Sequence, residues 1–183
     1  ARLLAKLPEV HFLIVGNGTT RATLERQAAE MGLTNVRFLP FQPRERVPEM
    51  YAAADVSLVL LKQGIGADSV PSKAYTILAS GRPLIASVDP DAETTRLVEE
   101  SGCGVATPPQ NPTALAEAIR RLYADPAARA EMGQRGREYV TARYAPVRVA
   151  EEYESLFRDV VEAHRQSARA PRHRERPPRG GGR

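Results

Sequence analysis

At 183 residues, 42% of them hydrophobic and 26% charged, the chain has the size and composition of one globular domain with a sizeable core. No apolar run approaches the roughly 20 residues of a membrane-spanning helix, and the single cysteine, Cys103, excludes an internal disulfide and is expected to be a small buried residue. The net charge of +4 is uneven, because residues 165–183 hold seven arginines and one acid and leave residues 1–164 at −2.

Strands and helices alternate along the first part of the chain. The amphipathic start, with Leu3, Leu4 and Leu7, is interpreted as the end of a helix already under way in a longer protein. Strands are predicted at 10–15, 36–39, 55–61, 83–87 and 105–106, and helices at about 20–31, 44–53, 72–80 and 91–100. This alternation predicts a Rossmann-like α/β fold, a doubly wound parallel sheet with helices on both faces.

Two local features sharpen that prediction. The first strand is a continuous apolar run, which is typical of a strand buried on both faces of a parallel sheet. Thr19 or Thr20 is expected to cap the first long helix, and Asp91 the helix that follows the fourth strand.

Beyond Asn111 the pattern changes to helices alone. Asn111-Pro112, Asp125-Pro126 and Pro146 begin three helices, because proline is tolerated in a first helical turn. We expect one domain over 1–164, followed by a disordered basic tail of Pro, Gly and Arg over 165–183 that cannot bury a core.

A turn made of Gly16, Asn17 and Gly18 follows the first strand and suggests a dinucleotide site. The fingerprint of such sites needs a third small residue, and Arg21 stands there, where it would obstruct a close approach of helix and strand. Leu39 and Pro40 occupy the place of the acid that binds the ribose. A nicotinamide cofactor is therefore not expected, while a ligand-free tight turn and a loop near a nucleotide both remain open.

The loop from Gly64 to Lys73 is the strongest candidate for a ligand site. Gly64 and Gly66 permit close backbone approach, Asp68 is an acceptor, and Pro71 begins a helix whose first amides are free to bind an anion. Two hydroxyls and a cation follow within the same ten residues, from Ser69, Ser72 and Lys73. The structural alternative is a simple crossover loop in which the glycines only turn the chain.

Several other chemistries lack their residues. The three histidines are scattered and have no metal-ligand spacing, so no metal site is predicted. No Walker sequence and no G-x-S-x-G elbow is present, and we expect no cofactor beyond a substrate nucleotide.

Three blocks carry a resemblance to a known family: LIVGNGTTRATLE, VRFLPFQPRERVPEMYAAADVSLVLL and VPSKAYTILASGRPLIAS. In order and spacing they resemble the carboxyl-terminal half of family 4 glycosyltransferases of the GT-B fold. The likeness is greatest to bacterial sugar transferases of capsule, O-antigen and colanic acid assembly, of the kind that transfer N-acetyl-fucosamine. It covers Ala1 to about Val161.

The resemblance implies a donor-binding half of a retaining enzyme that moves a sugar from a nucleoside diphosphate-sugar, a UDP- or GDP-sugar, without a required metal. The loop from Pro40 to Pro43, with Phe41 and Gln42, would face the base, and the Gly16–Gly18 turn would lie near the ribose and phosphates. Asp68 and Lys73 are the implied catalytic pair. The sugar and diphosphate would be surrounded by Gly64, Ile65, Gly66, Ser69, Val70, Pro71, Ser72 and Thr76.

Two departures from the family pattern weaken the implied site. The family's two glutamates, separated by seven residues, correspond here to Asp68 and Thr76, so the second loses its charge and its hydrogen bond to the ribose weakens. The arginine and lysine that clamp the diphosphate would precede Ala1, and Lys73 is the candidate to share that role.

The remaining expectations concern partners and rival functions. The resemblance implies an amino-terminal acceptor domain in cis, a glycan or lipid-linked acceptor, and a cytoplasmic place with peripheral contact at the inner membrane face, without specific nucleic acid. A nucleotide-sugar 2-epimerase half is the rival enzyme, although His11 is poorly placed for it. A non-catalytic nucleotide-binding module, whose tail reaches a membrane or nucleic acid, is the rival of another class.

Overall fold

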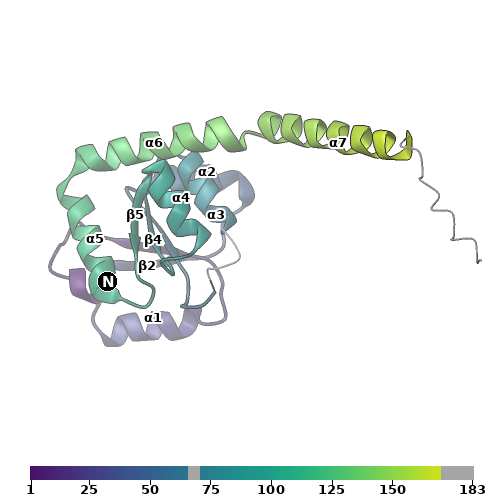
Figure 1. Ribbon diagram of the computed structural model, residues 1–183. Helices are drawn as coiled ribbons and strands as arrows, with labels where there is room; N and C mark the ends of the chain where they lie inside the picture. Colours follow the sequence, from purple (N-terminus) through teal and green to yellow (C-terminus); the bar gives the residue numbers. More distant parts are fainter. Residues whose placement is uncertain (66–70, 170–183) are drawn as a thin grey trace, which may run out of the picture. The chain divides into compact units, whose positions relative to one another are not determined.

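The computed structural model describes residues 1–65 and 71–169 of the chain (Figure 1). It divides into two compact units, Ala1–Ala142 and Arg143–Arg183. The elements of the first unit are η1 (Arg2–Leu4), β1 (Phe12–Val15), α1 (Arg21–Glu30), β2 (Val36–Leu39), η2 (Arg44–Arg46), α2 (Val47–Ala52), β3 (Ser57–Leu60), α3 (Ser72–Ala79), β4 (Leu84–Ser87), α4 (Glu93–Ser101), β5 (Gly104–Thr107) and α5 (Pro112–Ala124). Helix α6 (Pro126–Tyr144) runs into the second unit, which continues with α7 (Pro146–Arg169).

The five strands are all parallel, as the sequence predicts, and they form two sheets. β1 pairs with β2 from Phe12↔Val36 to Val15↔Leu39, and β4 lies between β3 and β5 in the second sheet. No ladder joins β1 to β3 within the described residues. The α/β class with parallel strands and flanking helices is confirmed, whereas a continuous hydrogen-bonded sheet is not observed.

Helices cover both faces of the β3–β4–β5 sheet. Alternate side chains of β4 point to opposite faces, so Leu84 packs among α3, α4 and α6, while Ile85 packs against Ala118 and Leu122 of α5. All four residues of β4 are buried. The core of the first unit therefore sits around this central strand, and it includes Cys103, whose predicted burial is confirmed.

Helix α6 approaches the turn between α3 and β4 closely. A Cβ atom on Gly133 would lie 2.1 Å from the carbonyl oxygen of Gly81, and one on Gly136 would lie 2.9 Å from the Cβ of Cys103. Because real side chains do not tolerate the first of these distances, glycine is required at position 133 for this packing.

The first strand differs from its prediction. Leu13 is 51% exposed and Ile14 42%, so β1 is not buried on both faces. Helix α1 contributes no buried residue, and β1 pairs with β2 alone among the described strands. The apolar run is a strand, but its central residues are only about half covered.

Side chains cap some of the helix starts and not others. Asn111 and Asp125 each accept a hydrogen bond from a backbone N–H three residues later, at 3.0 and 2.9 Å, as expected for N-caps. Thr20 occupies the cap position of α1 without a side-chain bond, and its backbone is helical where an N-cap residue is normally extended. Asp91 is not the cap of α4, which begins instead from Ala92.

In the second unit, α7 continues to Arg169, five residues past the domain boundary expected at 164. Its apolar residues recur at helical spacing and are exposed, and two of its rings, Tyr153 and Phe157, lie with centroids 6.0 Å apart. Residues 170–183 of the predicted tail lie outside the described residues. Across 1–65 and 71–169, no helix combines the length and the apolar character needed to cross a membrane.

Candidate functional site

Two of the predicted ligand loops meet where β1 and β2 end. Gly16 follows Val15 with φ +143°, a backbone conformation that residues other than glycine rarely adopt. Its N–H donates to the carbonyl of Leu39 at 3.0 Å. The Gly16–Gly18 turn therefore lies beside the loop that starts at Pro40. Parallel pairing of the two strands brings both loops to the carboxyl edge of the sheet, where α/β folds bind ligands.

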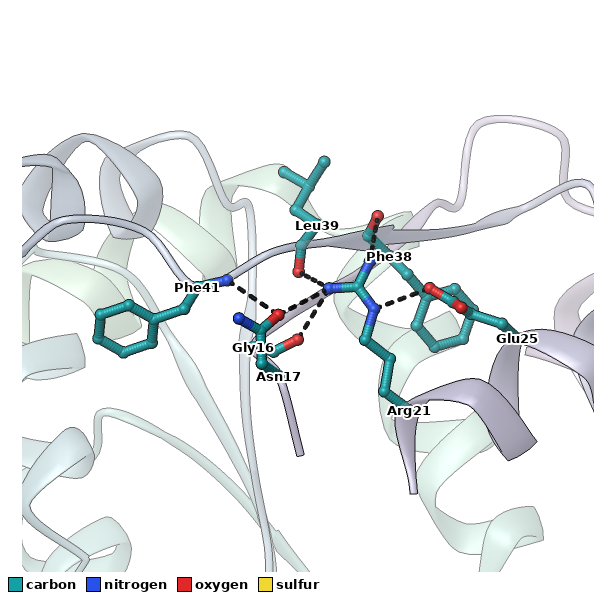
Figure 2. Close-up of polar contacts among 7 residues, drawn as sticks. All are labelled: Gly16, Asn17, Arg21, Glu25, Phe38, Leu39 and Phe41. Carbon is teal, nitrogen blue, oxygen red and sulfur yellow. Dashed lines mark hydrogen bonds and ion pairs between the residues drawn. The ribbon is translucent and has the colours of Figure 1, made fainter. Parts of the chain in front are cut away.

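The guanidinium of Arg21 lies between these loops (Figure 2). Its Nη1 donates to the carbonyl oxygens of Gly16 and Leu39, both at 2.9 Å, and to Oδ1 of Asn17 at 3.1 Å. Its Nη2 reaches the carbonyl of Phe38 at 3.5 Å, and its Nε donates to Glu25 at 2.8 Å. The sequence predicts only an obstructive bulk at this position, and nothing in the sequence shows these contacts.

The loop after β2 is linked to the turn by a second contact. The backbone N–H of Phe41 donates to Oδ1 of Asn17 at 3.4 Å, while Nε2 of Gln42 donates to the carbonyl of Pro40 at 3.0 Å. The ring of Phe41 points away from the polar network (Figure 2) and is 74% exposed. A flat apolar ring is thus presented to solvent beside the turn.

The third predicted region begins at α3. Pro71 precedes the helix, Ala74 N–H donates to its carbonyl at 2.8 Å, and no described residue accepts from the N–H of Ser72 or Lys73. Ser72 and Thr76 lie one turn apart on the exposed side of α3, with the Thr76 hydroxyl 3.5 Å from the Ser72 carbonyl. Free amides at a helix start carry a partial positive charge and favour anions.

Lys73 adds a full positive charge to this helix start. Its side chain is exposed and makes no hydrogen bond or ion pair with any described residue. Partial desolvation by the surrounding protein nevertheless lowers the pKa of its ammonium below the ordinary value. A cation in this position gains from a nearby anion, since the anion would restore the interactions that desolvation removes.

Asp89 is a contributor that sequence reasoning missed. Its Oδ2 accepts a hydrogen bond from the N–H of Gly64 at 2.7 Å, and its carbonyl accepts from the hydroxyl of Thr95 at 2.8 Å. Gly64 has φ +79°, and Ile65 beside it is 58% exposed. The loop after β3 is therefore fixed to the end of β4 before it enters the segment 66–70.

The structure brings together some predicted residues and not others. The turn residues Gly16, Asn17 and Gly18 lie beside Phe41 and Gln42. A second set follows β3 of the other sheet: Gly64 and Ile65 in the loop, Pro71 before α3, and Ser72, Lys73 and Thr76 on α3. No hydrogen bond between described residues connects these two sets. Gly66, Asp68, Ser69 and Val70 lie outside the described residues. Within the described chain, no three His, Cys, Asp or Glu side chains form a metal-ligand group.

Comparison with known proteins identifies the family. The profile of the family described as glycosyl transferases group 1 matches residues 1–139. The chain is 34% identical over 119 residues to the probable glycosyltransferase WbjE of Pseudomonas aeruginosa and 34% identical over 111 residues to the putative colanic acid biosynthesis glycosyl transferase WcaI of Escherichia coli. These matches take in 65% and 60% of the chain but 30% and 27% of the relatives, so the chain spans about a third of their length.

Solved structures share the fold. Sucrose-phosphate synthase from Thermosynechococcus elongatus superposes with a TM-score of 0.71 at 28% identity, over 87% of this chain and 41% of that one. Anabaena HepE, solved in complex with UDP, superposes with a TM-score of 0.70 at 21% identity, over 85% of this chain and 43% of that one. Both resemblances agree with the GT-B half expected from the three sequence blocks. The chain belongs to the group 1 glycosyl transferases.

Proposed function

We propose that the chain is the donor-binding half of a retaining glycosyltransferase. It binds a nucleoside diphosphate-sugar and presents it to a glycan or lipid-linked acceptor, which an acceptor domain in cis binds at the cytoplasmic face of the membrane. The reaction breaks the bond between the anomeric carbon and the diphosphate and forms a new bond to an acceptor hydroxyl. The acceptor proton leaves with the diphosphate.

The observation that carries the proposal is the start of α3, where the amides and the lysine have no partner among the described residues. Breaking the sugar–diphosphate bond develops negative charge on the leaving phosphate, and prepositioned donors stabilise that charge. The N–H groups of Ser72 and Lys73, which no described residue accepts from, and the Lys73 ammonium supply such donors at one place. A nucleoside diphosphate matches this site because its phosphate oxygens accept hydrogen bonds from both the backbone N–H groups and the ammonium.

The comparisons support the ligand class. HepE, which shares the fold, has been solved in complex with UDP and in complex with UDP-glucose. WbjE and WcaI are both described as glycosyltransferases, the second in colanic acid biosynthesis. These are properties of those proteins, and they favour a nucleotide-sugar as the substrate here over the other anions that a helix start accepts.

We propose a role for each of the loops at the carboxyl ends of the strands and for the start of α3. Phe41 and Gln42 face the base, Gly16, Asn17 and Gly18 lie near the ribose and phosphates, and Asp68 orients the sugar. The diphosphate is bound by Ser69, Ser72 and Lys73, while Gly64, Ile65, Gly66, Val70, Pro71 and Thr76 line the rest. Thr76 offers a neutral hydroxyl where an acid would bind a ribose hydroxyl more strongly, by about 1 kcal/mol.

Sugar transfer by the intact enzyme tests the proposal. Lys73→Gln removes the cation and Asp68→Asn removes the acid, and each is expected to lower kcat/KM for the nucleotide-sugar by at least about tenfold, which is the effect of one lost charge-assisted bond. Lys6→Gln is the matched control, because Lys6 precedes β1 at the opposite end of the strand. Wild-type rates in both test variants would overturn the proposed site.

Two further readouts test the chemical class. Nuclear magnetic resonance of the first product formed should show the anomeric configuration of the donor, since the proposed reaction retains it. Activity should survive removal of divalent cations by a chelator, because the leaving charge is stabilised by protein donors. An inverted product, or activity that depends on a metal, would contradict the mechanism while leaving the family unchanged.

A further inference from the structure

Apolar packing around the Gly16–Gly18 turn is sparse. Helix α1, which follows the turn, has no buried residue, and the central residues of β1 are half exposed. The two β1–β2 loops are therefore located mainly by the strand ladder and by polar contacts beyond its end. Arg21 and Asn17 supply those contacts.

Arg21 bridges segments that are distant in sequence. It is bonded to the carbonyl of Gly16 in its own turn and, 18 residues away, to the carbonyl of Leu39 at the end of β2. Asn17 accepts from both Arg21 and the N–H of Phe41, so one amide oxygen connects the guanidinium to the loop after β2. Without the guanidinium, two hydrogen bonds would still join the turn to β2 and the loop after it: the Gly16 N–H to the Leu39 carbonyl, and the long bond from the Phe41 N–H to Asn17.

Each guanidinium nitrogen of Arg21 already has an acceptor in the protein, and the single contact of Nη2 is long at 3.5 Å. The carboxylate of Glu25 at 2.8 Å offsets the charge of the guanidinium. An arginine has five N–H donors in a fixed fork, and here the fork is directed at main-chain oxygens. The geometry is that of an internal brace and does not leave the open fork that binds phosphate.

We propose that Arg21 is a positioning residue for nucleotide binding. It sets the spacing between the Gly16–Gly18 turn and the loop that carries Phe41 and Gln42, and it thereby sets the affinity for the nucleotide part of the donor without touching it. This inference rests on the proposed function, which assigns the nucleotide to these two loops. It adds a residue that contributes through geometry and not through its charge.

The test compares three arginine variants in the intact enzyme. Arg21→Gln removes the brace, Arg21→Lys keeps the charge but loses the planar fork, and Arg26→Gln is the control. Arg26 lies on the same helix and also faces a glutamate one turn on, at 3.8 Å, but its side chain makes no hydrogen bond to either loop. Kinetics are measured with varied nucleotide-sugar, and amide hydrogen exchange is measured at Gly16 and Phe41.

A brace predicts a specific pattern. Arg21→Gln should raise KM for the nucleotide-sugar about tenfold while kcat and the KM for the acceptor stay within about twofold, because the bound ground state and the transition state lose the same binding energy. Arg21→Lys should raise KM at least about threefold, since one ammonium cannot bond both loops. Exchange at Gly16 and Phe41 should accelerate in both Arg21 variants and not in Arg26→Gln.

The outcomes separate the two proposals. If Arg21→Lys binds the donor as the wild type does, charge suffices and the positioning role is wrong. If exchange accelerates but KM does not change, the brace exists and does not serve the nucleotide. If Arg21→Gln does not fold, Asn17→Ala, which removes the oxygen that accepts from both Arg21 and the Phe41 N–H, must accelerate exchange at Phe41 and raise KM for the inference to stand. A wild-type enzyme that binds no nucleotide-sugar overturns both proposals.

Discussion

In the β3–β4–β5 sheet every residue of the central strand is buried, whereas β1 beside β2 leaves Leu13 51% and Ile14 42% exposed. The β3–β4–β5 sheet is enclosed by α3, α4 and α6 on one face and α5 on the other. The β1–β2 pair is joined at its carboxyl edge by the polar contacts of Arg21 and Asn17 (Figure 2).

The contrast separates stability from local geometry. Burial of apolar surface contributes about 25 cal/mol per Å², so global stability of the first unit depends on the covered sheet. Loops that bind ligands are drawn from regions of lower local stability, where a few polar contacts set the conformation. Changes in the covered sheet should therefore unfold the protein, and changes at the β1–β2 edge should alter the loops.

The largest effect is expected from truncating the central strand. Leu84→Ala removes a side chain that is 0% exposed, and it should lower the free energy of unfolding by about 2–5 kcal/mol through lost transfer energy and a cavity. Leu13→Ala, in the half-exposed strand, should cost less than about 1.5 kcal/mol. Urea denaturation checks both. Equal losses would show that the two sheets do not differ in this way.

A smaller loss is expected from adding one methyl group to α6. Gly133→Ala places a Cβ against the carbonyl of Gly81, so the helix must shift, and the free energy of unfolding should fall by about 1–3 kcal/mol. Gly18→Ala is the control in the other region, because no atom lies within 4 Å of its added Cβ. A Gly133→Ala protein as stable as the wild type in thermal unfolding would contradict the close packing.

Loss of the Asp89 carboxylate should be felt locally. Asp89→Ala leaves the Gly64 N–H without its charged acceptor, a change of about 1–2 kcal/mol, and hydrogen exchange at Gly64 and Ile65 should accelerate. Asp91→Ala, at an exposed position two residues on, should leave exchange unchanged. Acceleration in both variants, or in neither, would mean that Asp89 does not fix the loop after β3.

The smallest effect belongs to the surface ion pair between Arg26 and Glu30. Its atoms are 3.8 Å apart and both side chains are about two thirds exposed, so Glu30→Gln should change the free energy of unfolding by less than about 0.5 kcal/mol. Added salt should remove what difference there is. A larger loss would mean that this exposed ion pair contributes substantially to the stability of α1.

The sequence was sufficient for the order of elements and for the α/β class. Apolar runs and X-Pro helix starts are local signals, and helices begin at Asn111-Pro112 and Asp125-Pro126 as predicted. It was not sufficient for the environment of β1, because an apolar run does not state which element covers it. Thr20 and Asp91 were assigned as caps from residue type, whereas a cap also needs a particular backbone conformation.

The candidate site shows the same limit. Ser72 and Lys73 lie at a helix start because Pro71 signals one, and their ligand roles stay predictions. The contacts of Arg21 and Asp89 had no signal in the sequence, since their partners are main-chain atoms 18 and 25 residues away. Residue type predicts what a side chain can donate or accept, but the fold decides which distant backbone groups it meets.

The central claim is that the start of α3 with Lys73 binds the diphosphate of the donor. Calorimetric titration of the intact protein with UDP or GDP, and with the matching nucleoside, tests it most directly. The account predicts that the diphosphate binds much more tightly than the nucleoside and that Lys73→Gln weakens diphosphate binding about tenfold while leaving nucleoside binding unchanged. Equal affinity of wild type and Lys73→Gln for the diphosphate, or no binding of any nucleoside diphosphate, would contradict it.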